Sequence, residues 1–339
     1  MFISKHLLRF RLLNPKIKLT LLALLCLCVA VLGVAVGAQN YSGDLWSLLL
    51  ESNSLNHDAL VVQARIPRVL TCWLSGFALG AAGSVIFCLT KNPLADTGLL
   101  GISSGAQAAI ATFSIANLAA HFAFFYQAFI GSLFSSFLIY YLARKKTTAF
   151  NIILSGMALN LILQSYIKAC VLLYPDLFQD FKYWMVGSAS GLTWVDVAGI
   201  LPPVAVAACG LWLITPALNL LCFDRATAIS LGLNVQLYIL LAWFLVTVLA
   251  ASATAFVGSL SFLGLLSFHV ARYFFAGNLT VQLPAAGLVG GLLLLLADIA
   301  ARTLLAPQEL SVGILVSLIG APFLYIAVKH EFNRSGRAV

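Results

Sequence analysis

One apolar segment contains a glycine, two amide side chains and an ammonium group that would share a single helix face. Gly156, Asn160, Gln164 and Lys168 recur at every fourth position, so a helix would align them over about 18 Å of rise. Because amide and ammonium groups are costly in lipid, this face should contact protein or water. Two interpretations remain open, namely hydrogen bonds between helices and the lining of a translocation pathway.

The sequence lacks two common enzymatic motifs. There is no GxxxxGK[ST] phosphate loop, so we do not expect the chain itself to hydrolyse ATP, and there is no HExxH. His269 alone among five histidines lies well inside an apolar segment, where a structural role is favoured over metal ligation. The seven cysteines mostly fall in apolar stretches without a CxxC, which favours small buried side chains over disulfides. We therefore predict no catalytic residue, no bound metal and no cofactor.

The elements that must position these groups are membrane helices. Of the 339 residues, 62% are hydrophobic and only 9% are charged, whereas soluble domains are about 25% charged. A spanning helix needs about 20 apolar residues, so the composition predicts an all-α polytopic membrane protein of about ten transmembrane helices. The expected spans are 19–38, 67–89, 99–118, 121–143, 149–173, 196–215, 236–256, 260–276, 283–305 and 311–328.

The distribution of basic residues predicts the orientation. With the N-terminus inside, fourteen of the nineteen Lys and Arg residues fall in cytoplasmic segments, as the positive-inside rule requires. We therefore expect both termini in the cytoplasm, and the formal net charge of +8 needs no nucleic-acid partner. The expected organisation is a basic cytoplasmic N-terminus (1–18), one transmembrane domain (19–330) and a cytoplasmic tail (331–339).

Several segments are too specific in pattern to be ordinary lipid-facing helix. They are Arg65–Ala106 with its NPLADTGLLG, Leu154–Asn160 (LSGMALN), Phe181–Trp194, Leu218–Val235, Phe256–Arg272 and Leu293–Tyr325. In this order they resemble the permease subunits of ABC importers for iron-siderophores, haem and vitamin B12 (cobalamin). The similarity extends over about residues 60 to 330, so the chain is identified as a member of that family.

The resemblance implies a fold, a function and an assembly. The fold would be the type II ABC importer permease, in a multi-pass protein of the bacterial inner membrane. The function would be uptake of an iron-siderophore, or of haem or cobalamin, as a non-enzymatic transport subunit. The expected partners are a second permease subunit (homo- or heterodimer), two cytosolic ATPases that bind the ATP and Mg, an extracytoplasmic substrate-binding protein and membrane lipid.

The resemblance also implies roles for particular residues. The segment 218–235, long enough for two short helices, would contact the ATPase. Its implied coupling residues are Asp224, Arg225, Ala226, Ala228, Leu231 and Gly232. Arg65, Arg68 and Arg302 stand where the positive-inside rule expects few basic residues, and the resemblance implies that they dock the binding protein. Anchoring to lipid phosphates or capping of helix carbonyls is the alternative for these arginines. The family's fifth helix lines its pathway, which favours the pathway interpretation of the polar stripe.

The chain departs from the family pattern at a few positions. Phe87 stands where Gln is usual, Ser259 and Phe268 stand where Pro is usual, and Lys91 stands where Arg is common. These departures leave the substrate and the pairing of the permease open.

Two other functions remain as alternatives. An ion-coupled secondary transporter would need intramembrane acids, and only Asp298 lies deep in an expected span. A permease of the same family that carries an oxyanion is the second alternative.

Overall fold

The computed structural model describes residues 14–37, 57–92, 95–116, 124–143, 149–275 and 277–335. Within these ranges the secondary structure is entirely helical. The elements are α2 (Pro15–Ala35), α4 (His57–Thr90), the 3₁₀ helix η1 (Thr97–Leu100), α5 (Ile102–Ile115), α6 (Phe124–Ala143), α7 (Ala149–Leu173), α8 (Gln179–Val186), α9 (Trp194–Phe223), α10 (Arg225–Ser230), α11 (Val235–Val257), α12 (Leu263–Phe274), α13 (Leu279–Thr303) and α14 (Val312–Ser335).

Each predicted span coincides with a helix in the described part of the chain. Seven of these helices are long and apolar enough to cross a membrane. Helices α5 and α12 have only 14 and 12 residues, because each follows a break in which one residue adopts a left-handed conformation: Gly101 has φ +68° and Phe262 has φ +66°. The count of ten spans therefore stays a prediction, while the all-helical membrane fold is confirmed.

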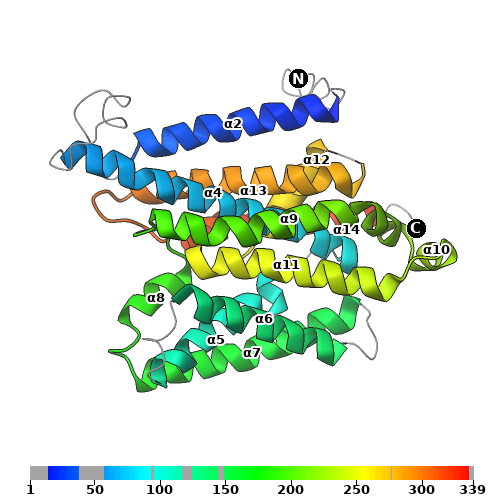
Figure 1. The fold of residues 1–339 in the computed structure, drawn as a ribbon, viewed down its shortest axis with the longest axis horizontal. Helices are drawn as coiled ribbons and strands as arrows, with labels where there is room; N and C mark the ends of the chain where they lie inside the picture. The colour runs from blue at the N-terminus through cyan, green and yellow to red at the C-terminus, as the bar shows by residue number, and fades with distance from the viewer. Residues whose placement is uncertain are drawn as a thin grey trace.

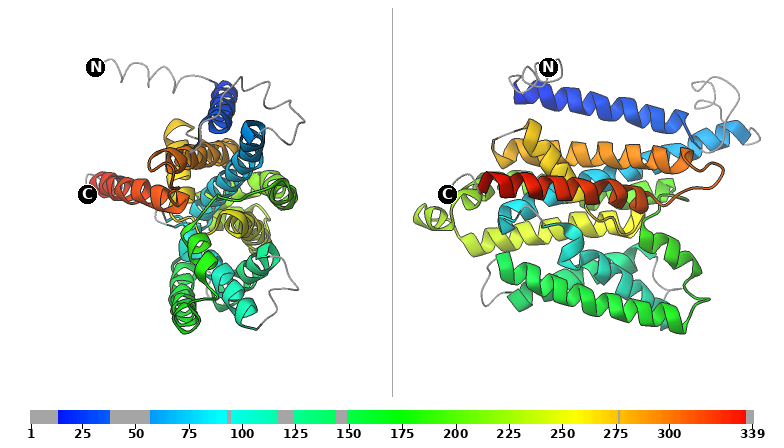
Figure 2. Two further views of the ribbon diagram at one scale, coloured as in Figure 1. Left: turned by 90° about the vertical axis from the view of Figure 1, so that its left-hand side faces the viewer. Right: turned by 180° about the vertical axis from the view of Figure 1, so that it is seen from behind.

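The helices lie roughly side by side, and α4 runs through the middle of the bundle (Figures 1 and 2). It contacts α13, α11, α12 and α9, whereas α5, α6 and α7 form a group on the far side of α11. Helix α2 begins and α14 ends at the end of the bundle that carries α10 (Figure 1). We call this the coupling end. The start of α2 and the end of α14 thus lie at the same end of the bundle, while the placement of both termini in the cytoplasm stays a prediction.

Glycines allow α4 to pack closely against its neighbours. A side chain at Gly76 would collide with the backbone of Gly290 in α13, and one at Gly83 would collide with the backbone of Gly264 in α12. Small residues at such spacing let helix backbones approach in lipid. The glycine-rich stretches of the sequence are therefore packing surfaces.

Large apolar side chains are exposed along the outer helices. Leu161 of α7 and Val206 and Leu213 of α9 are examples. In a soluble protein such a surface would be unfavourable, whereas in a bilayer it contacts lipid chains or another apolar subunit.

The predicted coupling segment 218–235 differs from expectation in one respect. We expected two short helices, but residues 218–223 are the last turns of α9, and only α10 forms a separate short helix before α11 begins at Val235. The reason is that α9 continues through Pro216, since neighbouring elements in a membrane protein can satisfy the backbone groups that a proline frees.

Candidate functional site

Helix α10 protrudes from the coupling end of the bundle (Figure 1). Asp224 both ends α9 and caps α10, because its carboxylate accepts hydrogen bonds from the Thr227 backbone N–H at 3.2 Å and the Thr227 hydroxyl at 3.3 Å. These hydrogen bonds hold the pKa of Asp224 below its usual value. Helices α9 and α10 are therefore joined by a single capping residue.

The six predicted coupling residues occupy different faces of this segment. Ala228 is fully buried against the bundle, whereas the others are exposed. The exposed residues are Asp224, Arg225, Ala226, Leu231 and Gly232. Gly232 has φ +80°, a conformation that glycine adopts without strain. The segment thus presents a small, mixed polar and apolar surface to a partner.

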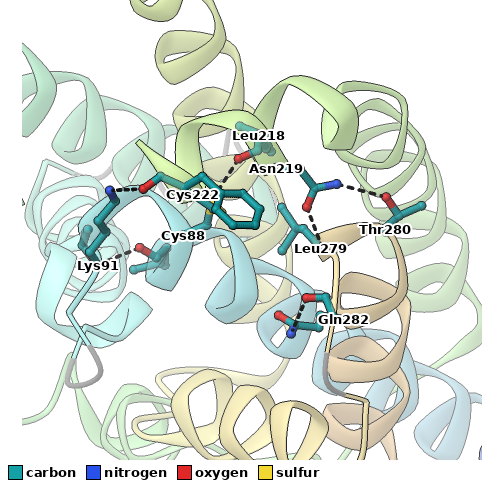
Figure 3. The surroundings of a disulfide bond; sticks show 12 residues. Cys88, Lys91, Leu218, Asn219, Cys222, Leu279, Thr280 and Gln282 are labelled. Atoms are coloured by element: carbon teal, nitrogen blue, oxygen red, sulfur yellow. Dashed lines mark hydrogen bonds between the residues drawn. A yellow bond between two sulfur atoms is a disulfide. The ribbon is translucent and has the colours of Figure 1, made fainter. Parts of the chain in front are cut away.

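The last turn of α9, directly before α10, is attached to α4. Cys222 forms a disulfide with Cys88, and the Lys91 ammonium donates a hydrogen bond to the Phe223 carbonyl at 3.1 Å (Figure 3). The expectation that no cysteine forms a disulfide was wrong for this pair. The two residues are 134 apart in sequence, and only the packing of α4 on α9 brings them together.

Asn219 attaches the same turn of α9 to α13. Its side-chain oxygen accepts from the Leu279 backbone N–H at 2.7 Å, and its amide donates to the Thr280 hydroxyl at 3.3 Å (Figure 3). Asn219 therefore binds the first turn of α13, where backbone N–H groups lack helical partners. The base of α10 is held by both central helices, α4 and α13.

The three arginines predicted to dock a binding protein lie together at the opposite end of the bundle. Arg65, Arg68 and Arg302 line one pocket of about 370 Å³ together with Glu309. Arg68 pairs with Asp298 at 2.8 Å and with Glu309 at 2.9 Å, and Arg302 pairs with the second oxygen of Asp298 at 2.7 Å. Asp298 is fully buried, so the two arginines neutralise it.

Two of these arginines also cap α2. Arg302 donates to the Gly33 and Val36 carbonyls, and Arg65 donates to the Val34 and Ala35 carbonyls. These are the carbonyls that a helix leaves without partners at its C-terminus. Carbonyl capping, the alternative weighed for the arginines, is thus observed, and docking of a partner stays a prediction.

The polar stripe of α7 faces α5 in part. Gln164 donates a hydrogen bond to Gln107 of α5 at 3.0 Å, and Gly156 is buried beside Gly101. Asn160 is half-buried and Lys168 is exposed. Interhelical hydrogen bonding therefore accounts for Gln164, while the pathway interpretation of the stripe stays a prediction.

Asp96 is a buried carboxylate that the sequence analysis missed. It directly precedes η1, and it accepts a hydrogen bond at 2.9 Å from the backbone N–H of Phe262, the residue before α12. Its place directly before η1 could have suggested a capping role. Its partner at the start of α12, 166 residues away, could not have been found from spacing.

Known proteins resemble this chain over nearly its whole length. It is 33% identical to the ferric enterobactin transport system permease protein FepD of Escherichia coli, and the alignment covers 91% of this chain and 94% of that protein. It is 34% identical to the hemin transport system permease protein HmuU of Yersinia pestis, with coverage of 95% and 98%. It is 30% identical to the Fe(3+)-citrate import system permease protein YfmE of Bacillus subtilis, with coverage of 95% and 97%.

A solved structure has the same fold. It is described as an inward-facing conformation of a metal-chelate type ABC transporter, and it superposes with a TM-score of 0.80 at 25% identity, covering 93% of this chain and 99% of that one. Residues 21–329 match the FecCD transport family. The ordered motifs, the helical membrane fold and these similarities together establish that the chain belongs to the FecCD transport family.

Proposed function

We propose that the chain is the membrane-spanning permease subunit of a binding-protein-dependent ABC importer in the bacterial inner membrane. The observation that carries the proposal is similarity to import permeases over nearly the full length of both chains. The exposed α10, whose base is held to α4 and α13 through Phe223 and Asn219, is consistent with a contact that receives force from a partner.

The proposed assembly contains a second permease subunit, as a homo- or heterodimer, and two cytosolic ATPases that bind ATP and Mg. The exposed apolar surfaces of α7 and α9 are available to a second subunit or to lipid. The exposed residues of the coupling segment, Ala226 and Leu231 among them, would contact the ATPase.

Docking of an extracytoplasmic binding protein is proposed for the arginine pocket. Arg65, Arg68 and Arg302 line the same pocket at the end opposite α10. Guanidinium groups suit bidentate pairing with carboxylates. Because Glu309 already pairs with Arg68, an acidic residue of the partner would have to compete with Glu309.

The proposed cargo is an iron chelate, either a ferric siderophore or haem, with cobalamin and an oxyanion as the alternatives. The printed names of the relatives refer to ferric enterobactin, hemin and Fe(3+)-citrate. The exposed ammonium of Lys168 on α7 is compatible with an anionic chelate. Ion-coupled secondary transport gains no support, because Asp298, the acid on which it depended, is paired with two arginines.

Uptake by the reconstituted complex tests the proposal. The chain would be placed in proteoliposomes with candidate permease, ATPase and binding-protein partners, and uptake of ferric siderophore, haem, cobalamin and molybdate would be compared with and without ATP. ATP-dependent uptake of one iron chelate is expected. Uptake driven by an ion gradient without ATP would contradict the proposal.

A further inference from the structure

The ends of α4 and α9 are connected by one covalent bond and one weak bond at the base of α10. The Cα atoms of Cys88 and Cys222 are 5.1 Å apart, within the range that a disulfide bridges. Three residues after Cys88, the Lys91 ammonium binds the Phe223 carbonyl. The two connections join the same pair of helix ends, but they differ in how easily they break.

Movement of α10 must act on Cys222. Only Phe223 and the capping residue Asp224 separate Cys222 from α10, so a partner that shifts α10 pulls on the last turn of α9. A hydrogen bond such as that of Lys91 contributes about 1 kcal/mol and can break and reform in every cycle. A disulfide does not break without a thiol or a reductant.

The pair lies where its oxidation state can change. Cys222 is half-buried and therefore accessible to a small reagent, while Cys88 behind it is 4% exposed. The positive-inside rule places the coupling end in the cytoplasm, where thiols are normally kept reduced. Under those conditions the two residues are thiols, and the disulfide forms when the compartment becomes oxidising.

We propose that Cys88 and Cys222 form a thiol–disulfide switch that arrests coupling when it is oxidised; this inference rests on the proposed function. The oxidant is a low-molecular-weight disulfide, RS–SR. The Cys222 thiolate attacks one of its sulfurs and expels RS⁻, and the Cys88 thiolate then attacks the Cys222 sulfur and expels the second RS⁻. Two electrons pass from the cysteine pair to RS–SR, and the two protons of the cysteine thiols appear on two RSH.

The switch is tested in a chain that retains only this cysteine pair. The other cysteines, all outside a disulfide in this structure, are replaced by serine; they are Cys26, Cys28, Cys72, Cys170 and Cys209. The reconstituted complex is treated with glutathione disulfide, and bond formation is read from the mass of the chain, which loses two hydrogens in the intramolecular disulfide and gains glutathione in a mixed disulfide. Oxidation is expected to reduce ATP-dependent uptake to the level without ATP, and dithiothreitol is expected to restore it. Cys88→Ser and Cys222→Ser should transport equally under both conditions.

A second measurement does not depend on transport. Hydrogen–deuterium exchange of the α10 backbone amides should slow roughly tenfold on oxidation, because the attachment of α10 becomes covalent. Exchange and uptake that are both unchanged although the bond forms would overturn the switch, as would failure of glutathione disulfide to form the bond. Slowed exchange without any ATP-dependent uptake, in either oxidation state, would support the switch and count against the proposed function.

Discussion

Phe87 of α4 stacks on Phe268 of α12, with ring centroids 4.3 Å apart and ring planes 28° from parallel. The Arg272 guanidinium lies 4.9 Å from the centre of the Phe87 ring, within the distance at which a ring face attracts a cation. Both phenylalanines are positions at which the sequence analysis expects departures from the family pattern. The structure places these two residues in one contact between α4 and α12.

A double-mutant cycle on this pair should reveal the contact. Phe87→Ala and Phe268→Ala should show a coupling energy of about 0.5–1.5 kcal/mol, the typical contribution of an aromatic pair. The measurement is the free energy of unfolding of the two single variants and the double variant in detergent micelles. Phe134 of α6, which is largely exposed, is the matched control, and Phe134→Ala should be additive with Phe268→Ala. Additivity of Phe87→Ala with Phe268→Ala would contradict the stacking role.

Bulky substitutions in α10 should distinguish loss of the ATPase contact from displacement of α10 itself. Ala226 is exposed, so Ala226→Trp should block ATPase contact while α10 keeps its position, whereas Ala228 is buried and Ala228→Trp should displace α10 itself. Both should abolish ATP-dependent uptake and leave membrane insertion intact. ATPase co-purification and uptake are measured, with Ala205→Trp on the exposed face of α9 as the control. Normal ATPase association and uptake in the Ala226→Trp and Ala228→Trp variants would show that α10 does not couple the two subunits.

Asp298→Asn should strongly destabilise the chain. The substitution leaves the buried Arg302 and the largely buried Arg68 without their shared counter-ion, and breaking a buried pair costs about 3–5 kcal/mol. Glu309→Gln should cost much less, because Glu309 is partly exposed and exposed pairs contribute about 0–1 kcal/mol. Thermal unfolding in detergent compares the two variants, and equal losses would argue against a central role for Asp298.

Thiol labelling should identify the environment of the polar stripe. In a cysteine-depleted background, Asn160→Cys should react with an aqueous maleimide in at least one transport state. Gln164→Cys should react more slowly, because its side chain faces Gln107 of α5. The exposed Leu161 supplies the matched control, since Leu161→Cys should be inert if that face contacts lipid. Inertness at both stripe positions, with and without nucleotide, would favour helix packing over a pathway.

The helices could be predicted from sequence more readily than their ends. Apolar runs identify the spans because the bilayer imposes their length. The second span was expected to begin at residue 67, yet α4 begins at His57 and contains Pro67. Prolines and charged residues mark helix ends in water. Here Pro67 stands inside α4, and the charged Arg65 and Arg68 find carbonyl and carboxylate partners within the bundle.

In the candidate site, contacts between residues close in sequence could likewise be predicted, whereas contacts between distant residues could not. The Asp298–Arg302 pair has the i, i+4 spacing that places two side chains on one helix face. This ion pair could therefore be predicted from the sequence. The partners of Asp96, Cys88 and Arg68 are 166, 134 and 230 residues away. Such contacts depend on which helices pack together, and hydrophobic periodicity carries no information about that choice.

The long separation between Arg68 and Asp298 has a consequence for biosynthesis. Helix α4 leaves the ribosome with its arginines, while the acids that neutralise Arg68 lie in α13 and in the turn before α14. Until those acids have been synthesised Arg68 has neither counter-ion, and we expect α4 to stay near the membrane interface, where its charges are hydrated. Synthesis of α13 should then favour packing of α4 in the bundle, so a chain that terminates before Asp298 should be less stable in the membrane than a complete one.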